Sequence, residues 1–200
     1  MLDAVSAFFR LNMMFARNTL TIWVFSSLLG GYALAAAPRT GNDSFDPIYS
    51  VLTHPRCLNC HPNGDTPRQG LDAHLHEPRV KRGPHDRGTA GLHCMACHQD
   101  KNYAASGVPG APNWHLAPLS MAWENLSPGE LCRALLDPSK NGNKDLRAIV
   151  EHLTRDELVA WGWAPGTDAN GKARAPVPIP KPEFNRIVHA WAKGGAKCPQ

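Results

Sequence analysis

A five-residue pattern occurs twice in the chain and limits its possible folds more than any other feature. Residues 57–61 have the sequence CLNCH and residues 94–98 the sequence CMACH. In a helical turn, residues i, i+3 and i+4 lie on one face, so each stretch presents two thiols and an imidazole to the same side. Covalent attachment of a c-type haem requires this arrangement, because the two sulfurs bond to the porphyrin and the histidine then lies beneath the iron.

The two motifs therefore predict two covalently attached c-type haems. The attachment residues are Cys57, Cys60, Cys94 and Cys97, and the proximal iron ligands are His61 and His98. The alternative is a four-thiolate zinc site, which also uses two C-x-x-C pairs. Residues 61–93 separate the pairs here, which is longer than the usual zinc spacing, and a histidine directly follows each pair.

The N-terminal segment has the pattern of an export signal. Arg10 and Arg17 precede an uncharged run at residues 19–37 that ends in small residues. We predict residues 1–35 as a signal peptide cut after Ala35; the alternative is an uncleaved anchor, since the run is just long enough to span a bilayer. The protein is accordingly expected in the periplasm, or alternatively anchored to the inner membrane, with residues 36–200 as a single two-haem domain.

Proline and glycine are abundant, at 18 and 17 of the 200 residues, which favours long loops over a large conventional core. Segment 62–92 has few large aliphatic residues and no sustained helical or alternating period. Ordering such a segment alone is costly in entropy, whereas porphyrin faces would give it an apolar surface to pack on. The expected fold is mainly α, with short cytochrome c-like helices and long Pro/Gly-rich loops wrapped around two covalent haems.

Amphipathic spacing and capping signals predict where the helices lie. Apolar residues at helical spacing mark segments that begin near residues 46, 127, 146, 154 and 182. The predicted capping residues are Asp46, Thr89, the pairs Ser127 with Glu130 and Thr154 with Glu157, and Gly194 at the end of the last helix. We expect Trp161, Trp163 and Trp191 to pack around haem.

Two cysteines, Cys132 and Cys198, remain after haem attachment. Only one pairing is then possible, and export to an oxidising compartment favours it. We predict a structural disulfide that ties the chain end to a helix; the alternative is two buried free thiols.

The face of each iron opposite its proximal histidine decides between an electron carrier and an enzyme, since a second histidine or a methionine closes that face. We predict His76 and His115 as distal ligands, with His74 and Met121 as alternatives. In an extended segment His74 and His76 point to opposite sides, so at most one serves a given iron. His115 lies in a proline-rich stretch, residues 101–126, suited to cross a porphyrin face; its alternative is a place in an exposed loop.

Three other histidines are weaker candidates. His93 adjoins Cys94 and would reach over its own porphyrin poorly, and His152 and His189 lie in predicted helices, where a core or surface role is expected. The remaining ligands still suffice to close both irons, which favours electron transfer.

Several segments beyond the haem motifs carry a family resemblance. They are residues 114–118 (WHLAP), 121–123 (MAW), 131–132 (LC), 141–142 (NG) and 158–163 (LVAWGW). In these the chain resembles small bacterial two-haem c-type cytochromes labelled isoquinoline 1-oxidoreductase subunits. The resemblance implies a periplasmic electron-transfer partner of a molybdenum hydroxylase or a similar dehydrogenase. The sequence contains no molybdopterin, flavin or nucleotide motif, so the hydroxylase itself would be another chain.

These observations predict an exported two-haem cytochrome that carries single electrons between a periplasmic oxidoreductase and the respiratory chain. The alternative is a small haem enzyme of peroxidase type with one open iron; no catalytic residue is assigned. The formal net charge of +4 falls by one when a leader containing Asp3, Arg10 and Arg17 is removed. Such a small charge favours neither nucleic acid nor an anionic membrane as a partner, so redox proteins are the expected partners.

Overall fold

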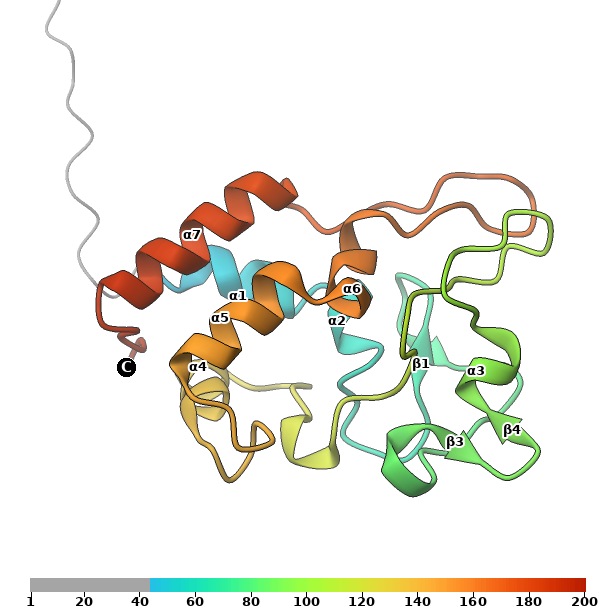
Figure 1. Cartoon of the computed structure of the whole chain (residues 1–200), viewed down its shortest axis with the longest axis horizontal. Helices are drawn as coiled ribbons and strands as arrows, with labels where there is room; N and C mark the ends of the chain where they lie inside the picture. Colours follow the sequence, from blue (N-terminus) through green and yellow to red (C-terminus); the bar gives the residue numbers. More distant parts are fainter. Residues whose placement is uncertain (1–43) are drawn as a thin grey trace, which may run out of the picture. The chain divides into compact units, whose positions relative to one another are not determined.

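Four helices form the apolar core of residues 44–200, the part of the chain that the computed structural model describes. They are α1 (Asp46–Leu52), α4 (Pro128–Leu136), α5 (Leu146–Arg155) and α7 (Lys181–Lys193). Helix α7 packs against α1 and α5, and α4 also packs against both (Figure 1). The largest side chains buried among them are Trp191, Phe45, Phe184, Ile48 and Leu131. We call these four helices the helical core.

The remaining elements are short and lie mostly between α1 and α4 in the sequence. The helical turns are α2 (Pro55–Leu58), η1 (Pro84–Asp86), α3 (Cys94–Cys97), η2 (Leu119–Met121), α6 (Glu157–Ala160) and η3 (Trp161–Trp163). Strands β1 (Arg68–Gln69) and β2 (His74–Leu75) form one antiparallel hairpin, and β3 (Gly88–Thr89) and β4 (Leu92–His93) form another. Two-residue strands have no detectable alternation, so the sequence did not predict them.

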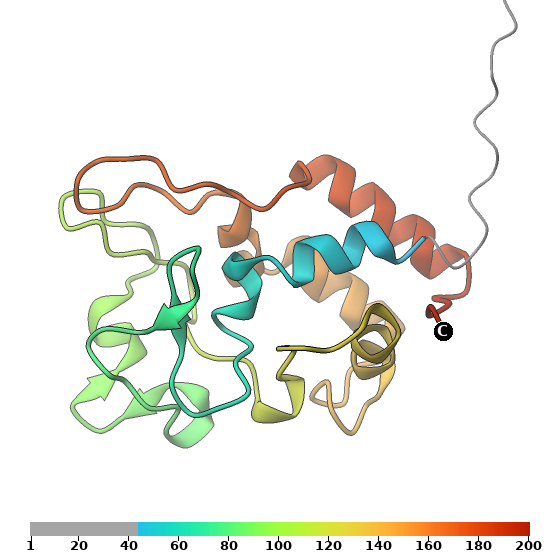
Figure 2. The same ribbon diagram turned by 180° about the vertical axis from the view of Figure 1, so that it is seen from behind.

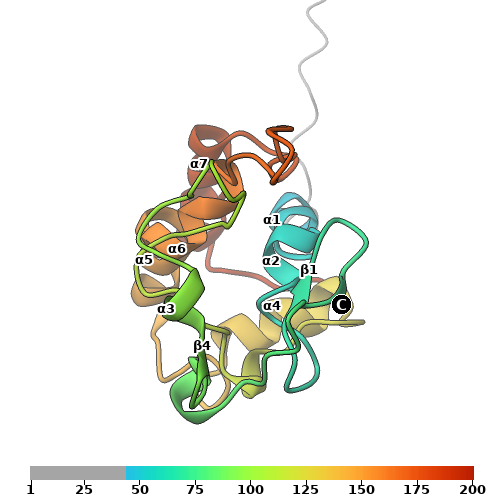
Figure 3. The same cartoon turned by 90° about the vertical axis from the view of Figure 1, so that its right-hand side faces the viewer.

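Residues 62–115 contain both hairpins and α3, and we call them the loop region. Seen from behind, this region lies beside the helical core rather than within it (Figure 2). In the view from the right-hand side, its α3 and β4 are on the side toward the viewer (Figure 3). Its buried apolar side chains are only Pro62, Val80 and Ala111. The described chain is therefore mainly helical with long loops, as expected, and its apolar packing is concentrated in one part.

Two predicted helix ends are confirmed. The side chain of Ser127 accepts a hydrogen bond from the backbone N–H of Glu130, whose carboxylate in turn accepts from the Ser127 N–H, so α4 begins with a capping box. Gly194 is the C-cap of α7.

Three predicted N-caps are wrong. Phe45, not Asp46, is the N-cap of α1, and Thr89 lies in β3 while α3 begins after His93. Thr154 stays within α5, where its Oγ1 donates to the Val150 carbonyl at 2.6 Å. Asp156 caps α6 instead, because its carboxylate accepts from the backbone N–H groups of Leu158 and Val159 at 2.9 and 3.1 Å.

The predicted disulfide is present. Cys132 in α4 and Cys198 are joined with an S–S distance of 2.01 Å and a Cα–Cα distance of 5.5 Å. Beside it, the Trp191 indole N–H donates to the Lys197 carbonyl at 3.1 Å. The bridge thus ties the chain end to the helical core, as predicted.

The described residues, 44–200, belong to one compact unit. The predicted signal peptide, residues 1–35, lies outside the described residues, as does the start of the predicted domain. Between residues 44 and 200, no helix combines the length and the apolar character needed to cross a membrane.

Candidate functional site

The first CxxCH motif stands on the short helix α2, directly after α1. Pro55 occupies the first helical position, where its fixed φ favours a helix start, and His54 caps the turn by accepting from the Arg56 N–H at 3.2 Å. This turn places Cys57 against the helical core. Burial raises the pKa of Cys57 to about 12 and that of Cys60 to about 11, so both thiols are protonated.

The second motif stands on α3, which follows the β3–β4 hairpin in the loop region. Cys94 is partly buried and Cys97 is exposed. Burial raises the pKa of Cys94. The pKa of Cys60 is raised mainly by burial and further by the negative charge of a Cys94 thiolate. The two motifs, far apart in sequence, are therefore electrostatic neighbours.

Both motif histidines have the same hydrogen bond. His61 Nδ1 lies 2.7 Å from the Met121 carbonyl, and His98 Nδ1 lies 2.7 Å from the Pro109 carbonyl. A carbonyl only accepts, so each ring donates at Nδ1 and keeps a lone pair on Nε2. Burial lowers the pKa of both imidazoles, that of His61 to about 3, so both are neutral at pH 7. A neutral ring that donates one nitrogen to a carbonyl and keeps the other free is the state of a metal-ligating histidine.

A tryptophan fixes the plane of each motif histidine. The His61 ring stacks on Trp123 with centroids 3.3 Å apart and planes 12° apart. The His98 ring stacks on Trp114 at 4.4 Å and 5°. The buried Nε1 of Trp123 has no hydrogen-bond partner in residues 44–200. An unpaired buried donor beside His61 is consistent with an absent polar ligand at this position.

A cavity of about 750 Å³ joins the two motifs. Its walls include Cys60, Cys94, Cys97 and His98, and the aromatic residues Trp114 and Trp161. The volume is within the range of about 300–1,000 Å³ that holds small-molecule cofactors. Of the three tryptophans expected to pack around haem, Trp161 lines this cavity, Trp163 packs against Phe184, and Trp191 lies in the helical core.

His76 lies next to His98 at this cavity, and the planes of the two rings are 63° apart in a T-shaped arrangement. The two ring centroids are 5.9 Å apart. An imidazole bonded to a metal at about 2 Å has its ring centre roughly 3 Å from that metal, so two facing ligands have ring centres roughly 6 Å apart. His76 Nδ1 lies 2.9 Å from the Pro78 carbonyl, and its Nε2 has no partner in the described chain. The spacing and both free Nε2 atoms fit an iron held between these two rings.

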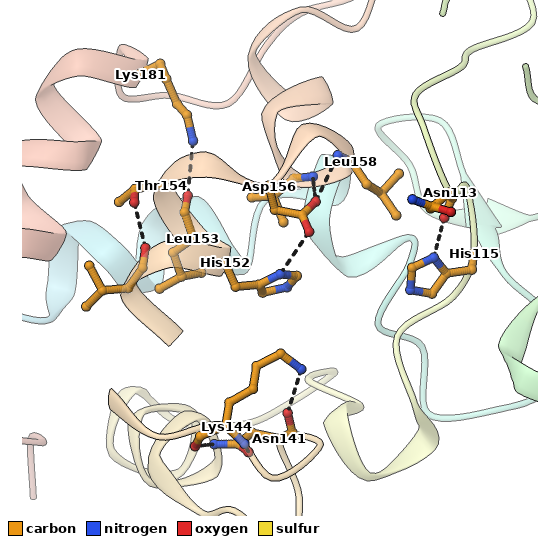
Figure 4. A network of polar contacts seen from close by, with 12 residues as sticks. Asn113, His115, Asn141, Lys144, His152, Leu153, Thr154, Asp156, Leu158 and Lys181 are labelled. Carbon is orange, nitrogen blue, oxygen red and sulfur yellow. Dashed lines mark hydrogen bonds and ion pairs between the residues drawn. The ribbon is translucent and has the colours of Figure 1, made fainter. Parts of the chain in front are cut away.

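The other predicted distal ligands differ in how their polar atoms are used. His74 lines the cavity, but its Nδ1 donates to Asp72 at 2.7 Å and its Nε2 accepts from the Gln69 amide at 2.9 Å. His115 also lines the cavity, and its Nδ1 bonds to the Asn113 carbonyl, which leaves Nε2 available (Figure 4).

Met121 lies on the Nδ1 side of His61. Its carbonyl accepts from that nitrogen, and its side chain is buried among residues of the helical core. Met121 therefore contacts His61 through its backbone, and its thioether lies in the apolar cluster.

Sequence reasoning missed the groups that orient the two motif histidines, His61 and His98. The carbonyls of Met121 and Pro109 carry no sequence signal, since every residue has a carbonyl. The stacked pair of Trp114 with His98 joins residues from two loops, so no spacing rule predicts it. Two cavity-lining arginines, Arg56 and Arg174, were also missed.

The zinc alternative lacks a geometric basis in the described residues. Within residues 44–200, no three His, Cys, Asp or Glu side chains gather closely enough to hold a metal ion. A haem iron needs fewer protein ligands, because the porphyrin supplies four and the protein supplies at most two. The residues present therefore fit haem better than a four-thiolate ion.

Comparison of the chain with models of known protein families, with curated proteins and with solved structures finds no match. The functional argument consequently depends on the motifs and on the geometry around them.

Proposed function

We propose that this protein is a two-haem c-type cytochrome that carries single electrons. One observation carries the proposal: each of two neutral histidines adjoins a pair of thiols, donates Nδ1 to a carbonyl and keeps Nε2 free. When bound, each haem supplies an iron that takes up and releases one electron. The chain's own part is to hold, orient and shield the two groups.

The His76–His98 pair supports a carrier at the second site. With an imidazole on each side, that iron would be six-coordinate, which suits electron transfer rather than reaction with a small molecule. Cys60 and Cys94 line the same cavity, and the charge of Cys94 affects the pKa of Cys60, which supports a short distance between the two proposed haems. An electron entering at one site would then have a short path to the other.

The proposed partners are redox proteins. A periplasmic oxidoreductase, such as the molybdenum hydroxylase implied by the family resemblance, would donate electrons, and a respiratory-chain protein would accept them. The proposed location is the periplasm, or the inner membrane surface if the N-terminal segment is retained.

An asymmetry between the two sites favours one second candidate, a small haem enzyme of peroxidase type. His98 has the His76 ring next to it, whereas the described residues place only Trp123 in ring contact with His61. An iron on His61 with an open face would bind peroxide or another small ligand.

The intact mass of the protein and its binding of carbon monoxide test both candidate functions, the electron carrier and the enzyme. The protein is expressed with a competent haem-maturation system, and its intact mass is compared with that of the C57S/C60S and C94S/C97S variants. Two haems in the wild type and one in each variant are expected. A colourless product, or a mass without two prosthetic groups, overturns the proposal. For the reduced protein, rapid stoichiometric CO binding at both irons contradicts the carrier, and binding at one iron supports the enzyme.

A further inference from the structure

A buried arginine beside the first motif has no acidic partner. Only 8% of Arg56 is exposed, and its Nε donates to the Ala175 carbonyl at 2.9 Å. Its guanidinium lies 5.7 Å from the centre of the Trp161 ring. No carboxylate of the described residues lies within ion-pair distance of it. Burying a cation without an anion costs desolvation free energy, so this guanidinium would be stabilised by an anionic group that the described residues do not supply.

A second arginine approaches the same place. The guanidinium of Arg174 donates to the carbonyls of Pro165, Thr167 and Gly107. It also forms no ion pair in residues 44–200. The charge of Asp168 raises the pKa of Arg174, but Asp168 Oδ1 accepts from the backbone N–H groups of Asn170 and Lys172. The charge of Arg174 lowers the pKa of Arg56, after the larger effect of burial, so the two cations repel each other.

Both arginines line the cavity that contains Cys94, Cys97 and His98. Four backbone carbonyls and one indole ring contact the two guanidinium groups and orient them. A planar guanidinium binds a carboxylate through two parallel hydrogen bonds, and two guanidinium groups on one wall match a diffuse negative charge better than a single cation does.

We infer that Arg56 and Arg174 form a carboxylate site that binds a propionate of the haem attached at Cys94 and Cys97. The inference rests on the proposed function, since it needs that haem. The low exposure of Arg56 favours a cofactor carboxylate over an acidic side chain of a redox partner, which would have to enter the cavity. Through this site the two arginines set the reduction potential of the second haem.

The variants R56Q and R174Q test the site, with R56K as the conservative replacement and R79Q as the matched control. Arg79 is in the loop region and is adjacent in sequence to residues that line the cavity. It is exposed, however, and its side chain forms an ion pair with Glu77 at 2.8 Å. The readout is the reduction potential of each haem from pH 5 to 9, followed optically in an electrochemical cell. Haem content by intact mass is measured in parallel.

A cation near the iron favours the reduced form, so its removal lowers the potential. In R56Q the equilibrium constant for reducing the second haem at pH 7 should fall about tenfold, which equals about 59 mV for a one-electron couple. The freed propionate should regain a proton near neutral pH, so the potential should become pH-dependent there. R174Q should show a smaller change of the same sign, R56K should restore the wild-type pH profile, and R79Q should match the wild type.

Three results overturn the inference without touching the proposed function. The first is that R56Q and R174Q each contain two haems and keep the wild-type reduction potential and pH profile. The second is an unchanged potential with an altered salt dependence of electron transfer from a partner, which assigns the arginines to docking. The third is a pH profile in R56K that resembles R56Q rather than the wild type. If R56Q fails to mature, R174Q and R56K carry the same tests. A wild-type protein without haem instead defeats the proposed function.

Discussion

The two CxxCH motifs share their local chemistry and differ in what supports them. Each has a helical turn, a histidine that donates Nδ1 to a carbonyl at 2.7 Å, and a stacked tryptophan. Cys57 and the carbonyl-bearing Met121 pack with the helical core. Cys97, in contrast, is exposed, and its helix follows a hairpin in a region with three buried apolar side chains.

This difference separates two ways of holding a cofactor. At the first motif, the wall of the site belongs to four helices that pack on one another through a continuous apolar cluster and a disulfide. In the loop region, the entropy of about fifty ordered residues has little apolar burial to offset it. A bound porphyrin would supply the missing apolar contacts. We therefore expect the loop region to depend on its haem more strongly than the helical core does.

The largest expected effect is a change of ligation in the loop region. His76→Ala removes the ring that lies next to His98, so the reduced variant should bind one more CO per protein than the wild type. His74→Ala is the matched control, because His74 lies two residues away with both ring nitrogens already bonded. CO titration of the reduced proteins measures the difference. Equal CO binding by both variants would reject His76 as the distal ligand of the His98 iron.

Removing the disulfide should weaken the helical core and leave the loop region's haem unchanged. The bridge closes a loop with a sequence separation of 66, and chain entropy predicts that C132S/C198S loses about 4 kcal/mol of unfolding free energy. Guanidinium titration followed by far-UV circular dichroism measures the loss, and the absorbance of the second haem serves as the internal control. A loss below about 1 kcal/mol, or a changed haem spectrum, would contradict the division into two regions.

A haem-free chain should lose order in the loop region first. In a variant with all four motif cysteines changed to serine, trypsin should cut at Arg79, Lys81 and Arg87 at least about tenfold faster than at Arg147 or Arg186 in the helical core, because local opening costs less where few apolar contacts break. Mass spectrometry of timed digests identifies the sites. The haem-loaded wild type is the control and should be protected at both sets. Equal cleavage in the two regions would show that the loop region is ordered without haem.

The sequence predicted the parts of this molecule that depend on local pattern. The helices of the core followed from apolar spacing, and the Cys132–Cys198 bridge followed from counting the cysteines left over. The two motif histidines could be singled out from their motifs, but the groups that orient them could not. A carbonyl at Pro109, a stacking Trp114 and an unpaired Arg56 acquire meaning only when distant loops meet.

The caps show the same limit on a smaller scale. Thr154 and Asp156 are both good N-caps, and the sequence alone placed the helix start at Thr154. The structure uses Asp156, because its carboxylate also reaches His152 at 3.3 Å while capping α6 (Figure 4). A side chain that serves two partners is favoured over one that serves a single partner, and the second partner is invisible in a local pattern.

The smallest expected effect concerns this Asp156 carboxylate, at the edge of the helical core. The hydrogen bond from His152 is the main cause that lowers the pKa of Asp156 to about 2, against an ordinary value of 3.8. The folded state therefore favours the ionised form, and this stability is complete above pH 4 and is lost as pH falls toward 2. Because the side chain is 37% exposed, solvent screening limits the effect to about 1 kcal/mol.

Asp156→Asn should retain the cap, since asparagine is an equally good N-cap, and lose only the acid-dependent part. Urea midpoints from pH 2 to 6 should therefore converge for variant and wild type near pH 2 and separate above pH 4. Glu151→Gln, in the exposed pair with Arg147 at 3.2 Å, is the control and should change stability by no more than about 0.5 kcal/mol at any pH. Parallel curves for D156N and the wild type would show that the His152 contact adds nothing, and the stability of the helical core would then come from its apolar packing and its disulfide alone.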